Sequence, residues 1–421
     1  MKLKASGFFR FLTAILLISL GMVAQYRYSL IENHLPFLQF KPNSAKTTRV
    51  NLANQPQPVD PASVDMSYFW EAWSYLQSDY IKQEEIDPDK MMDGATSGMV
   101  SALGDPYTMY LSPDDNQRSG EDLAGTFYGV GIELGYKDNT LAVAAPLPNT
   151  PAASAGIQAG DLILRVKDQS RDFDEETTGW SLQKAVNEIR GPKDSIVTLT
   201  LYRDNNGQEP FDVDVKRGEI LVNSVELEFV EGNGKKFAHL KLIRFGERTM
   251  IEWNNAIAQI LAQKADLTGI MLDLRNDPGG LFDVAIDVAS DFVEDGVVVT
   301  QKGKFASKEY QARGQARLAG IPVVVLVNKG SASASEIVAG ALRDQLSAKL
   351  IGSQTFGKGT VQDRRELSNG GGLHVTIARW LLPGGDWIND EGIPVDVEVD
   401  DNPDTETDEV VIKAEEVLGQ L

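Results

Sequence analysis

The sequence predicts an α/β protein that also contains a β-rich module and a helical N-terminal region. In residues 218–400, short apolar stretches that suit strands alternate with helix-like segments, an order typical of a mostly parallel sheet. In residues 125–203, glycine turns separate short strand-like segments around one helix-like segment. In residues 63–115, apolar side chains recur at helical spacing.

The first 30 residues predict export. Three basic residues precede an apolar run at 11–24, the order found in a secretory signal. The run is shorter than the ~20 residues that span a membrane. Met22 lies where a signal cleavage site favours a smaller side chain, so cleavage stays open. We expect a periplasmic or equivalent extracytoplasmic location, with residues 1–30 acting as a signal peptide or as an inner-membrane anchor.

Residues 31–62 predict an extended linker, and residues 63–122 predict a helical region. Prolines recur among the mostly polar residues of the linker. The helical region begins with a stripe of apolar and aromatic side chains at helical spacing: Phe69, Trp73, Leu76 and Tyr80. Such a stripe packs into a core or against another subunit, so a homo-oligomer formed through the N-terminal helices is one expectation.

The β-rich module is predicted to span residues 123–205. Val197, Leu199 and Leu201 alternate with threonines, as in a half-buried strand. A helix is indicated by four apolar residues at the spacing i, i+3, i+4, i+7: Leu182, Ala185, Val186 and Ile189.

A glycine-rich turn leads into the strand-like segment that begins at Ile132. Successive backbone N–H groups in such a turn can hold a carboxylate, while the edge of the following strand can pair with an extended peptide. Together with residues 155–164, this segment resembles a PDZ domain. The resemblance implies that a peptide's terminal carboxylate and last residues are bound by Gly129, Val130, Gly131 and Ile132. A small sandwich with a glycine-rich turn is the alternative.

The strongest indication of chemistry is a turn of small residues between a buried strand and a helix. Residues 321–327 are uniformly apolar, as in a strand covered on both faces, and a helix-like segment starts near Glu336. Such a turn presents a hydroxyl at the N-terminal end of a helix dipole. Three serines occupy it, Ser331, Ser333 and Ser335, and composition does not choose among them.

Lys358 lies 25 residues after Ser333, between two glycines. A serine and a lysine, each set in tightly turned backbone, are the parts of a hydrolase that uses an amine as its base. The amine works as a base only when it is neutral, so burial must lower its pKa from about 10.4. Gln362, four residues on, could hold that amine by a hydrogen bond without adding charge.

An acyl-transfer site also needs backbone N–H groups aimed at the developing oxyanion. One candidate is the N–H of Ala334, directly after the middle serine. The second comes from Gly279 or Gly280, where a strand-like segment ends in the sequence Asp-Pro-Gly-Gly. Glycine permits positive φ and the close approach of a substrate backbone.

Composition excludes several other classes of protein. Lysine and arginine number 40 against 61 acidic residues, a net charge of −21, so nucleic acid is not an expected partner. The chain has no cysteine, which excludes thiol catalysis and disulfides. Its three histidines lack metal-ligand spacing, so no metal or organic cofactor is expected. A Ser-His-Asp triad would need His374, and a lone histidine of that kind is more often structural.

Taken together, these stretches resemble the carboxyl-terminal processing peptidases, or tail-specific proteases. The resemblance runs from Met66 to Leu421 and includes the PDZ-like module and both catalytic stretches. Four further motifs also resemble this family, at residues 103–108, 111–113, 273–280 and 391–397.

The resemblance implies a serine endopeptidase that recognises substrate C-termini through its PDZ domain and cleaves exported proteins. It assigns Ser333 as the nucleophile, Lys358 as the general base and Gln362 as the residue that orients the base. It assigns the oxyanion hole to Ala334 and Gly279, with the next glycine as second choice.

The chain departs from the family pattern at Asp277, where asparagine is common. We expect the peptidase core at residues 206–401 and a C-terminal helix at 402–421. The expected substrates are proteins or peptides with free C-termini. Two alternatives stay open: a catalytically inert PDZ scaffold that only binds C-terminal peptides, and a hydrolase of another acyl substrate.

Overall fold

The structure, a computed structural model, describes residues 47–49, 63–203, 209–232, 234–399 and 407–421. The predicted signal or anchor at 1–30, and most of the linker at 31–62, lie outside these residues. Across the described ranges, no helix combines the length and the apolar character needed to cross a membrane.

The region before the β-rich module is mainly helical. Its elements are α2 (Ser67–Asp79), η3 (Gln83–Glu85), α3 (Pro88–Ser101), the short strand β2 (Met109–Leu111) and α4 (Pro113–Ala124). Asp87 and Ser112 cap α3 and α4 by accepting backbone N–H bonds, and a proline opens each helix. α4 ends at Gly125, whose φ of 68° is the left-handed conformation that glycine adopts easily.

The β-rich module is an antiparallel sheet ordered β4-β5-β6-β8-β9, with β7 paired to β6. Its elements are β4 (Ile132–Lys137), β5 (Thr140–Pro146), α5 (Pro151–Ser154), β6 (Leu162–Asp168), η4 (Gln169–Arg171), β7 (Phe173–Glu176), α6 (Leu182–Ile189), β8 (Ile196–Tyr202) and β9 (Phe211–Lys216). Val197, Leu199 and Leu201 are fully buried, which confirms the alternation read from the sequence. β9 completes the sheet beyond residue 205.

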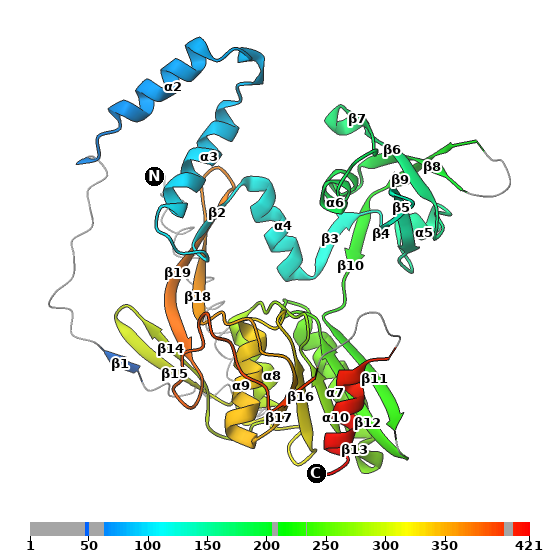
Figure 1. The fold of residues 1–421 in the computed structure, drawn as a ribbon, viewed down its shortest axis with the longest axis vertical. Coiled ribbons are helices and arrows are strands. Elements are labelled where there is room, and N and C mark those ends of the chain that lie inside the picture. Colours follow the sequence, from blue (N-terminus) through cyan, green and yellow to red (C-terminus); the bar gives the residue numbers. More distant parts are fainter. Residues whose placement is uncertain (1–46, 50–62, 204–208, 233, 400–406) are drawn as a thin grey trace, which may run out of the picture. The chain divides into compact units, whose positions relative to one another are not determined.

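A two-stranded ribbon forms where the chain enters and leaves this module. It pairs β3 (Thr126–Gly129) with β10 (Gly218–Leu221) in antiparallel register. The ribbon connects the module to the elements on either side of it in sequence, α4 and β11 (Figure 1).

The C-terminal core contains a sheet ordered β11-β12-β13-β16-β17-β20, parallel except at its β11 edge. Its strands are β11 (Val225–Gly232), β12 (Lys235–Leu242), β13 (Leu267–Asp273), β16 (Val323–Val327), β17 (Lys349–Gly352) and β20 (Val397–Glu398). The accompanying helices are α7 (Thr249–Ala262), η5 (Lys264–Asp266), α8 (Phe282–Ser290), α9 (Ala334–Leu346) and α10 (Glu409–Leu418).

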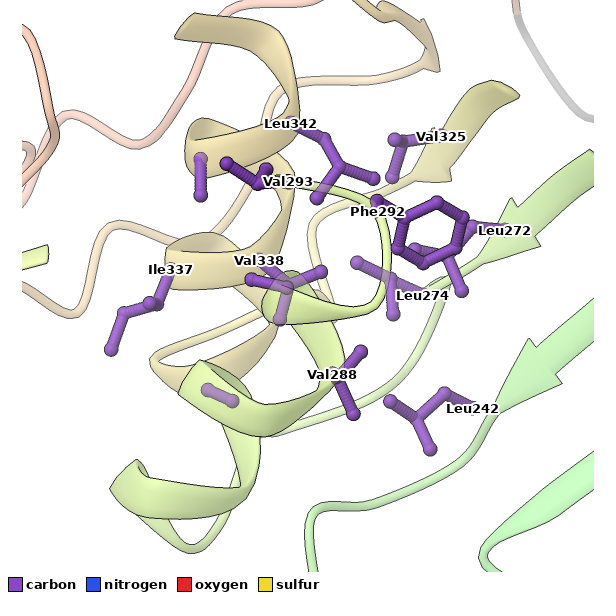
Figure 2. Close-up of a cluster of buried hydrophobic side chains, with 14 of the residues drawn as sticks. Leu242, Leu272, Leu274, Val288, Phe292, Val293, Val325, Ile337, Val338 and Leu342 are labelled. Atoms are coloured by element: carbon purple, nitrogen blue, oxygen red, sulfur yellow. The ribbon is translucent and has the colours of Figure 1, made fainter. Parts of the chain in front are cut away.

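Residues of β16 alternate between two apolar clusters. Val325 packs in the cluster that holds helices α7, α8 and α9, whereas Val324 packs with α10. Figure 2 shows Leu342 of α9 next to Val325, with Val338 one turn away. Full burial of such side chains contributes about 1.5–3 kcal/mol each. The strand and the helix after it are therefore held firmly, which fixes the turn between them.

A second sheet in the core is antiparallel. It is ordered β1-β15-β14-β19-β18, with β2 paired to β19, and its strands are β1 (Thr47–Arg49), β14 (Val297–Gly303), β15 (Ala306–Gln311), β18 (Thr360–Glu366) and β19 (Gly372–Leu381). The predicted α/β core with a mostly parallel sheet is therefore not confirmed for the core as a whole. Hairpins such as β18–β19 need only a short turn, and this local pairing produces an antiparallel layer beside the parallel one.

Ion pairs attach the C-terminal helix to the end of β13. Arg275 lies 2.7 Å from both Asp273 and Asp408, and Asp408 caps α10 by accepting the N–H of Val411. His239 contacts the same Asp273 at 2.9 Å. Burial raises the pKa of Asp273, but hydrogen bonds from His239 and Arg275 outweigh it and lower that pKa to about 2. The strand end that leads into the Asp-Pro-Gly-Gly turn is thereby fixed.

Candidate active site

Of the three serines in the turn after β16, Ser333 is the one that lines a cleft. Ser331 is buried and its hydroxyl donates to the Leu274 carbonyl at 2.8 Å. Ser335 is also buried and donates to the Asp277 carbonyl at 2.9 Å. These two hydroxyls join the turn to the end of β13, which leaves Ser333 as the candidate nucleophile.

Ser333 stands at the N-cap of α9 in an unusual backbone conformation. Its φ of 56° and ψ of −110° lie outside the regions that side chains favour. Its N–H donates to the Glu336 carboxylate at 2.8 Å. A strained residue held by its surroundings at a strand-to-helix turn is typical of a functional site.

The cleft has a volume of about 760 Å³ and receives side chains from several segments. Ser333, Lys358 and Gln362 line it together, as do Gly279 and Gly280. Residues of α4 and of the loop after β12 complete its wall. The structure thus brings to one cleft the serine and the lysine that the sequence predicts as partners.

Lys358 lies in the loop between β17 and β18. Burial lowers the pKa of its amine, while the charge of Glu336 acts in the opposite direction and raises it. The Nζ atom lies 5.3 Å from the centre of the Tyr107 ring. Across the described ranges of the chain, Nζ has no ion-pair or hydrogen-bond partner, so nothing there consumes its lone pair when it is neutral.

Glu336 connects the nucleophile turn to the lysine loop. Its Oε2 accepts the N–H of Ser333 at 2.8 Å and the N–H of Lys358 at 2.9 Å. Its Oε1 accepts the N–H of Gly357 at 2.7 Å and the hydroxyl of Thr355 at 2.6 Å. The side chain is fully buried. One oxygen therefore fixes the backbone of the predicted nucleophile relative to that of the predicted base.

Sequence reasoning missed the role of Glu336, although a signal was present. A serine followed three residues later by glutamate at a helix start is the pattern of a capping box. Its carboxylate accepts the N-cap N–H as that pattern predicts, and it accepts three further bonds from a loop that is distant in sequence.

Gln362, on β18, faces the same cleft but is bonded elsewhere. Its Nε2 donates to the hydroxyls of Thr360 and Thr376, at 2.9 and 3.1 Å. No hydrogen bond between Gln362 and Lys358 occurs in the described part of the chain. The predicted role in orienting the amine remains a prediction.

The predicted oxyanion-hole glycine packs directly on the nucleophile turn. Gly279 has a φ of 97°, and a Cβ there would lie 2.9 Å from Ser333 Cβ and 2.9 Å from Ala334 N. Only glycine fits such a position without displacing the turn. Its N–H is already used, however, because it donates to Asp277 Oδ1 at 2.8 Å. In the described residues, the N–H groups of Ala334 and Gly280 make no hydrogen bond.

His374 also lines the cleft, but the described residues offer it no carboxylate partner. Its Nε2 is buried without a hydrogen bond, and burial lowers its pKa, as do the charges of Arg364 and Lys358. A Ser-His-Asp arrangement is therefore absent from the described chain. Searched over the same ranges, the structure holds no group of three or more histidines, aspartates and glutamates suited to a metal ion.

The turn that the sequence predicts to bind a carboxylate requires glycine at Gly131. Gly131 has a φ of 77°, and a Cβ there would lie 2.4 Å from Thr150 Cβ, so glycine is required. β4 pairs with β5 along one side and forms the end of its sheet, which leaves its other edge open for an added strand. Helix α6 lies beside this strand and contributes Ala185 and Ile189 to the apolar core.

Comparison with known proteins assigns successive parts of the chain to family models. Residues 26–115 match the activating protease CtpB N-terminal domain, residues 120–202 match the PDZ domain, and residues 236–399 match peptidase family S41. A probable CtpA-like serine protease of Staphylococcus epidermidis is 39% identical over 329 residues, which are 77% of this chain and 63% of that protein. The chain therefore spans 63% of the length of this relative.

Two solved structures are also similar. The photosystem II D1 C-terminal processing protease is 31% identical, covers 80% of this chain and 89% of its own, and has a TM-score of 0.47. A putative S41 protease from Bacteroides fragilis is 16% identical, covers 87% of this chain and 100% of its own, and has a TM-score of 0.51, which supports the fold alone.

The matched models define a class of protein in which a PDZ domain precedes a peptidase S41 domain, and the named relative is described as a probable serine protease. Within that class, the chain belongs to peptidase family S41.

Replacing Glu336 by alanine should lower the free energy of unfolding by about 3 kcal/mol or more. Four donors would lose their buried acceptor, and each unsatisfied buried group costs about 1–3 kcal/mol. Urea unfolding measures the change. The matched control is Glu366→Ala on exposed β18, expected to stay within about 0.5 kcal/mol. Equal, small effects of the two variants would show that Glu336 does not hold the loops together.

Proposed function

We propose that this protein is an endopeptidase that captures the C-terminal segment of a protein substrate and cleaves it with Ser333 and Lys358. The observation that carries the proposal is the shared bond to Glu336 Oε2, which fixes the backbones of these two residues at one cleft. Burial that lowers the pKa of the amine supports its use as a base.

In the proposed reaction, Ser333 Oγ attacks the scissile carbonyl carbon while Lys358 Nζ takes the hydroxyl proton. The Ala334 N–H stabilises the oxyanion, because it lies at the start of α9 and is free of other bonds. The C–N bond then breaks, Lys358 returns the proton to the leaving amine, and an acyl-enzyme remains. Water, deprotonated by the same amine, hydrolyses the ester and restores Ser333. Gln362 is proposed to orient the amine during these steps.

The proposed substrate is an extended chain with a free C-terminus and apolar last residues. Backbone N–H groups of the turn at 129–132 would hold the carboxylate, and the open edge of β4 would pair with the preceding residues. The partly buried Ile132 and Leu134, which pack against the module's core, supply an apolar wall. Because the site would recognise a free carboxylate, it would favour natural or newly cleaved C-termini over internal loops.

We propose an extracytoplasmic location, supported by the basic and then apolar order of residues 1–24. Cell fractionation tests this proposal, and recovery of the protein in the cytoplasm alone would refute it. Whether the segment is cleaved or serves as a membrane anchor is read from the mass of the recovered protein.

We also propose that α2 mediates homo-oligomer formation. The helix buries none of its side chains, although it carries a run of aromatic residues. Tyr68, Trp70 and Tyr75 are each more than half exposed. A surface of this kind is costly in water and typical of a contact with another chain. The expected alternative, packing of the stripe into the protein's own core, does not occur within the described residues.

Ser333→Ala and Lys358→Ala should each reduce kcat/KM for an unfolded protein substrate by at least ~10³-fold, since each removes one half of the dyad. Mass spectrometry of the digest measures cleavage, and circular dichroism checks the fold. Lys329→Ala is the matched control, because this exposed lysine precedes the same turn. Turnover near that of the wild type in either dyad variant would refute the assignment. An inactive wild type that still binds peptides would favour the inert scaffold.

Amidating the C-terminus of a peptide should weaken its binding at least ~10-fold, because the nest of N–H groups loses its carboxylate. Fluorescence anisotropy with the Ser333→Ala variant measures binding without cleavage. The free-acid form of the same peptide is the matched control. Equal affinity of the two forms would contradict recognition of chain ends.

Trp70→Glu combined with Tyr75→Glu should shift the protein to a monomer in sedimentation equilibrium, because charges on exposed positions of α2 oppose burial of the helix against another chain. Glu84→Lys in η3, an exposed change nearby in sequence, should leave the assembly intact. A wild type that is already monomeric at micromolar concentration would refute the proposal.

A further inference from the structure

We propose that Asp277 is a positioning residue that controls the oxyanion hole through its own protonation: the neutral carboxyl leaves the Gly279 N–H available to the substrate, and the carboxylate withholds it. This inference rests on the proposed peptidase function. It adds a residue to that reaction and explains what an acidic side chain does at this position.

The backbone of Asp277 is bonded to the nucleophile turn. Its carbonyl oxygen accepts the Ala332 N–H at 3.0 Å and the Ser335 hydroxyl at 2.9 Å. The whole residue is buried. Bonds to the segments on both sides of Ser333 hold the backbone, so the carboxyl has no route to solvent without disrupting the turn.

The two oxygens of this carboxyl have different surroundings. Oδ1 accepts the Gly279 N–H at 2.8 Å. Oδ2 is buried and has no hydrogen-bond partner in the described part of the chain. A negative charge on Oδ2 would have no hydrogen-bond donor to stabilise it. The protonated form of the carboxyl, which carries no charge, is therefore favoured.

The Gly279 N–H has two acceptors to choose between. Gly279 lines the same cleft as Ser333, and a Cβ at this position would lie 2.9 Å from Ser333 Cβ, so its backbone is close to the carbonyl that Ser333 would attack. A single hydrogen cannot serve two acceptors at full strength. A carboxylate accepts bonds roughly twice as strong as a neutral carboxyl does, and its charge also repels a nearby oxyanion. Ionisation of Asp277 therefore opposes the transition state twice.

Burial, against the effect of the nearby charge, favours the neutral form of Asp277 near pH 7. Burial raises the pKa of this carboxyl to about 8, against the opposing effects of the Gly279 N–H, the Ser335 hydroxyl and the Arg244 guanidinium. Arg244 follows β12 and is the charged side chain whose field acts on the carboxyl. The elements on its other sides contribute hydroxyl and backbone groups: Ser335 from α9 and Ala332 from the turn.

Two titrations with opposite effects follow. Loss of the proton from Lys358 raises kcat/KM, and loss of the proton from Asp277 lowers it. A raised pKa in the folded state also makes the protein lose stability as pH rises from about 4, where an unfolded aspartate ionises, to about 8.

The test compares the wild type with Asp277→Asn from pH 5 to 10. Asparagine has the same shape and its Oδ1 can accept the Gly279 N–H, but it does not ionise. We expect the alkaline limb near pH 8 to disappear in this variant while the acidic limb stays. Circular dichroism at each pH separates this effect from unfolding. An alkaline limb that is the same in both proteins would overturn the inference.

A second variant tests the sign of the effect without changing Asp277. Arg244→Gln removes the cation that favours the carboxylate, so the alkaline limb should move to higher pH. A limb that moves to lower pH, or does not move, contradicts the proposed control.

Urea unfolding measures the same titration of Asp277 without relying on peptidase activity. The wild-type midpoint should fall relative to that of Asp277→Asn between pH 4 and 8, and parallel midpoints would contradict burial of an ionisable proton there. A wild-type protein that cleaves no substrate at any pH would refute the proposed function. An active wild type with an unchanged alkaline limb in Asp277→Asn sinks this inference alone.

Discussion

The buried carboxylate of Glu336 is the interaction on which the rest of the site depends. It accepts bonds from the turn after β16 and from the loop that leads from β17 of the same parallel sheet to β18 of the antiparallel sheet. A carboxylate that accepts four bonds in a dry environment is a strong constraint, because leaving any donor unpaired there is costly. Ser333 follows a strand of the parallel sheet, and Lys358 precedes a strand of the antiparallel sheet. Glu336 fixes the position of one residue relative to the other.

The two sheets divide the work of building the cleft. Apolar residues on both faces of β16 hold the strand and α9 firmly, so the unusual backbone of Ser333 persists between two rigid elements. Ser331 and Ser335 attach that turn to the end of β13 and thereby to the glycine turn. Ser333 is thus supported by bonds from its neighbouring serines to the segment after β13, at the carboxyl ends of the parallel strands.

Much of this arrangement could be read from local sequence. The apolar run at 321–327 and the helix-like segment from Glu336 correspond to β16 and α9, because burial and helical spacing leave strong periodic signals. The choice among three serines could not be made that way. It depends on hydroxyl bonds to Leu274 and Asp277, more than fifty residues away in sequence.

The antiparallel sheet and the occupied Gly279 N–H were missed for related reasons. β18 is largely polar and partly exposed, so its periodicity is weak, and β2 joins β19 across more than 250 residues of sequence. The bond from Gly279 to Asp277 is local, but a strand-to-helix turn and an oxyanion hole use the same residue types. The sequence shows that an acid stands there, and only the structure shows its buried, unpartnered oxygen.

The most direct test of the central claim is the titration of Lys358 itself. Lysine labelled with carbon-13 at Cε reports each amine by NMR, and the Lys358 signal is identified by its loss in Lys358→Met. A midpoint well below that of the other lysines is the result expected of an amine buried in the cleft that Ser333 also lines. A midpoint the same as that of the exposed lysines would mean that the amine is solvated and charged at neutral pH, and the dyad would have no base.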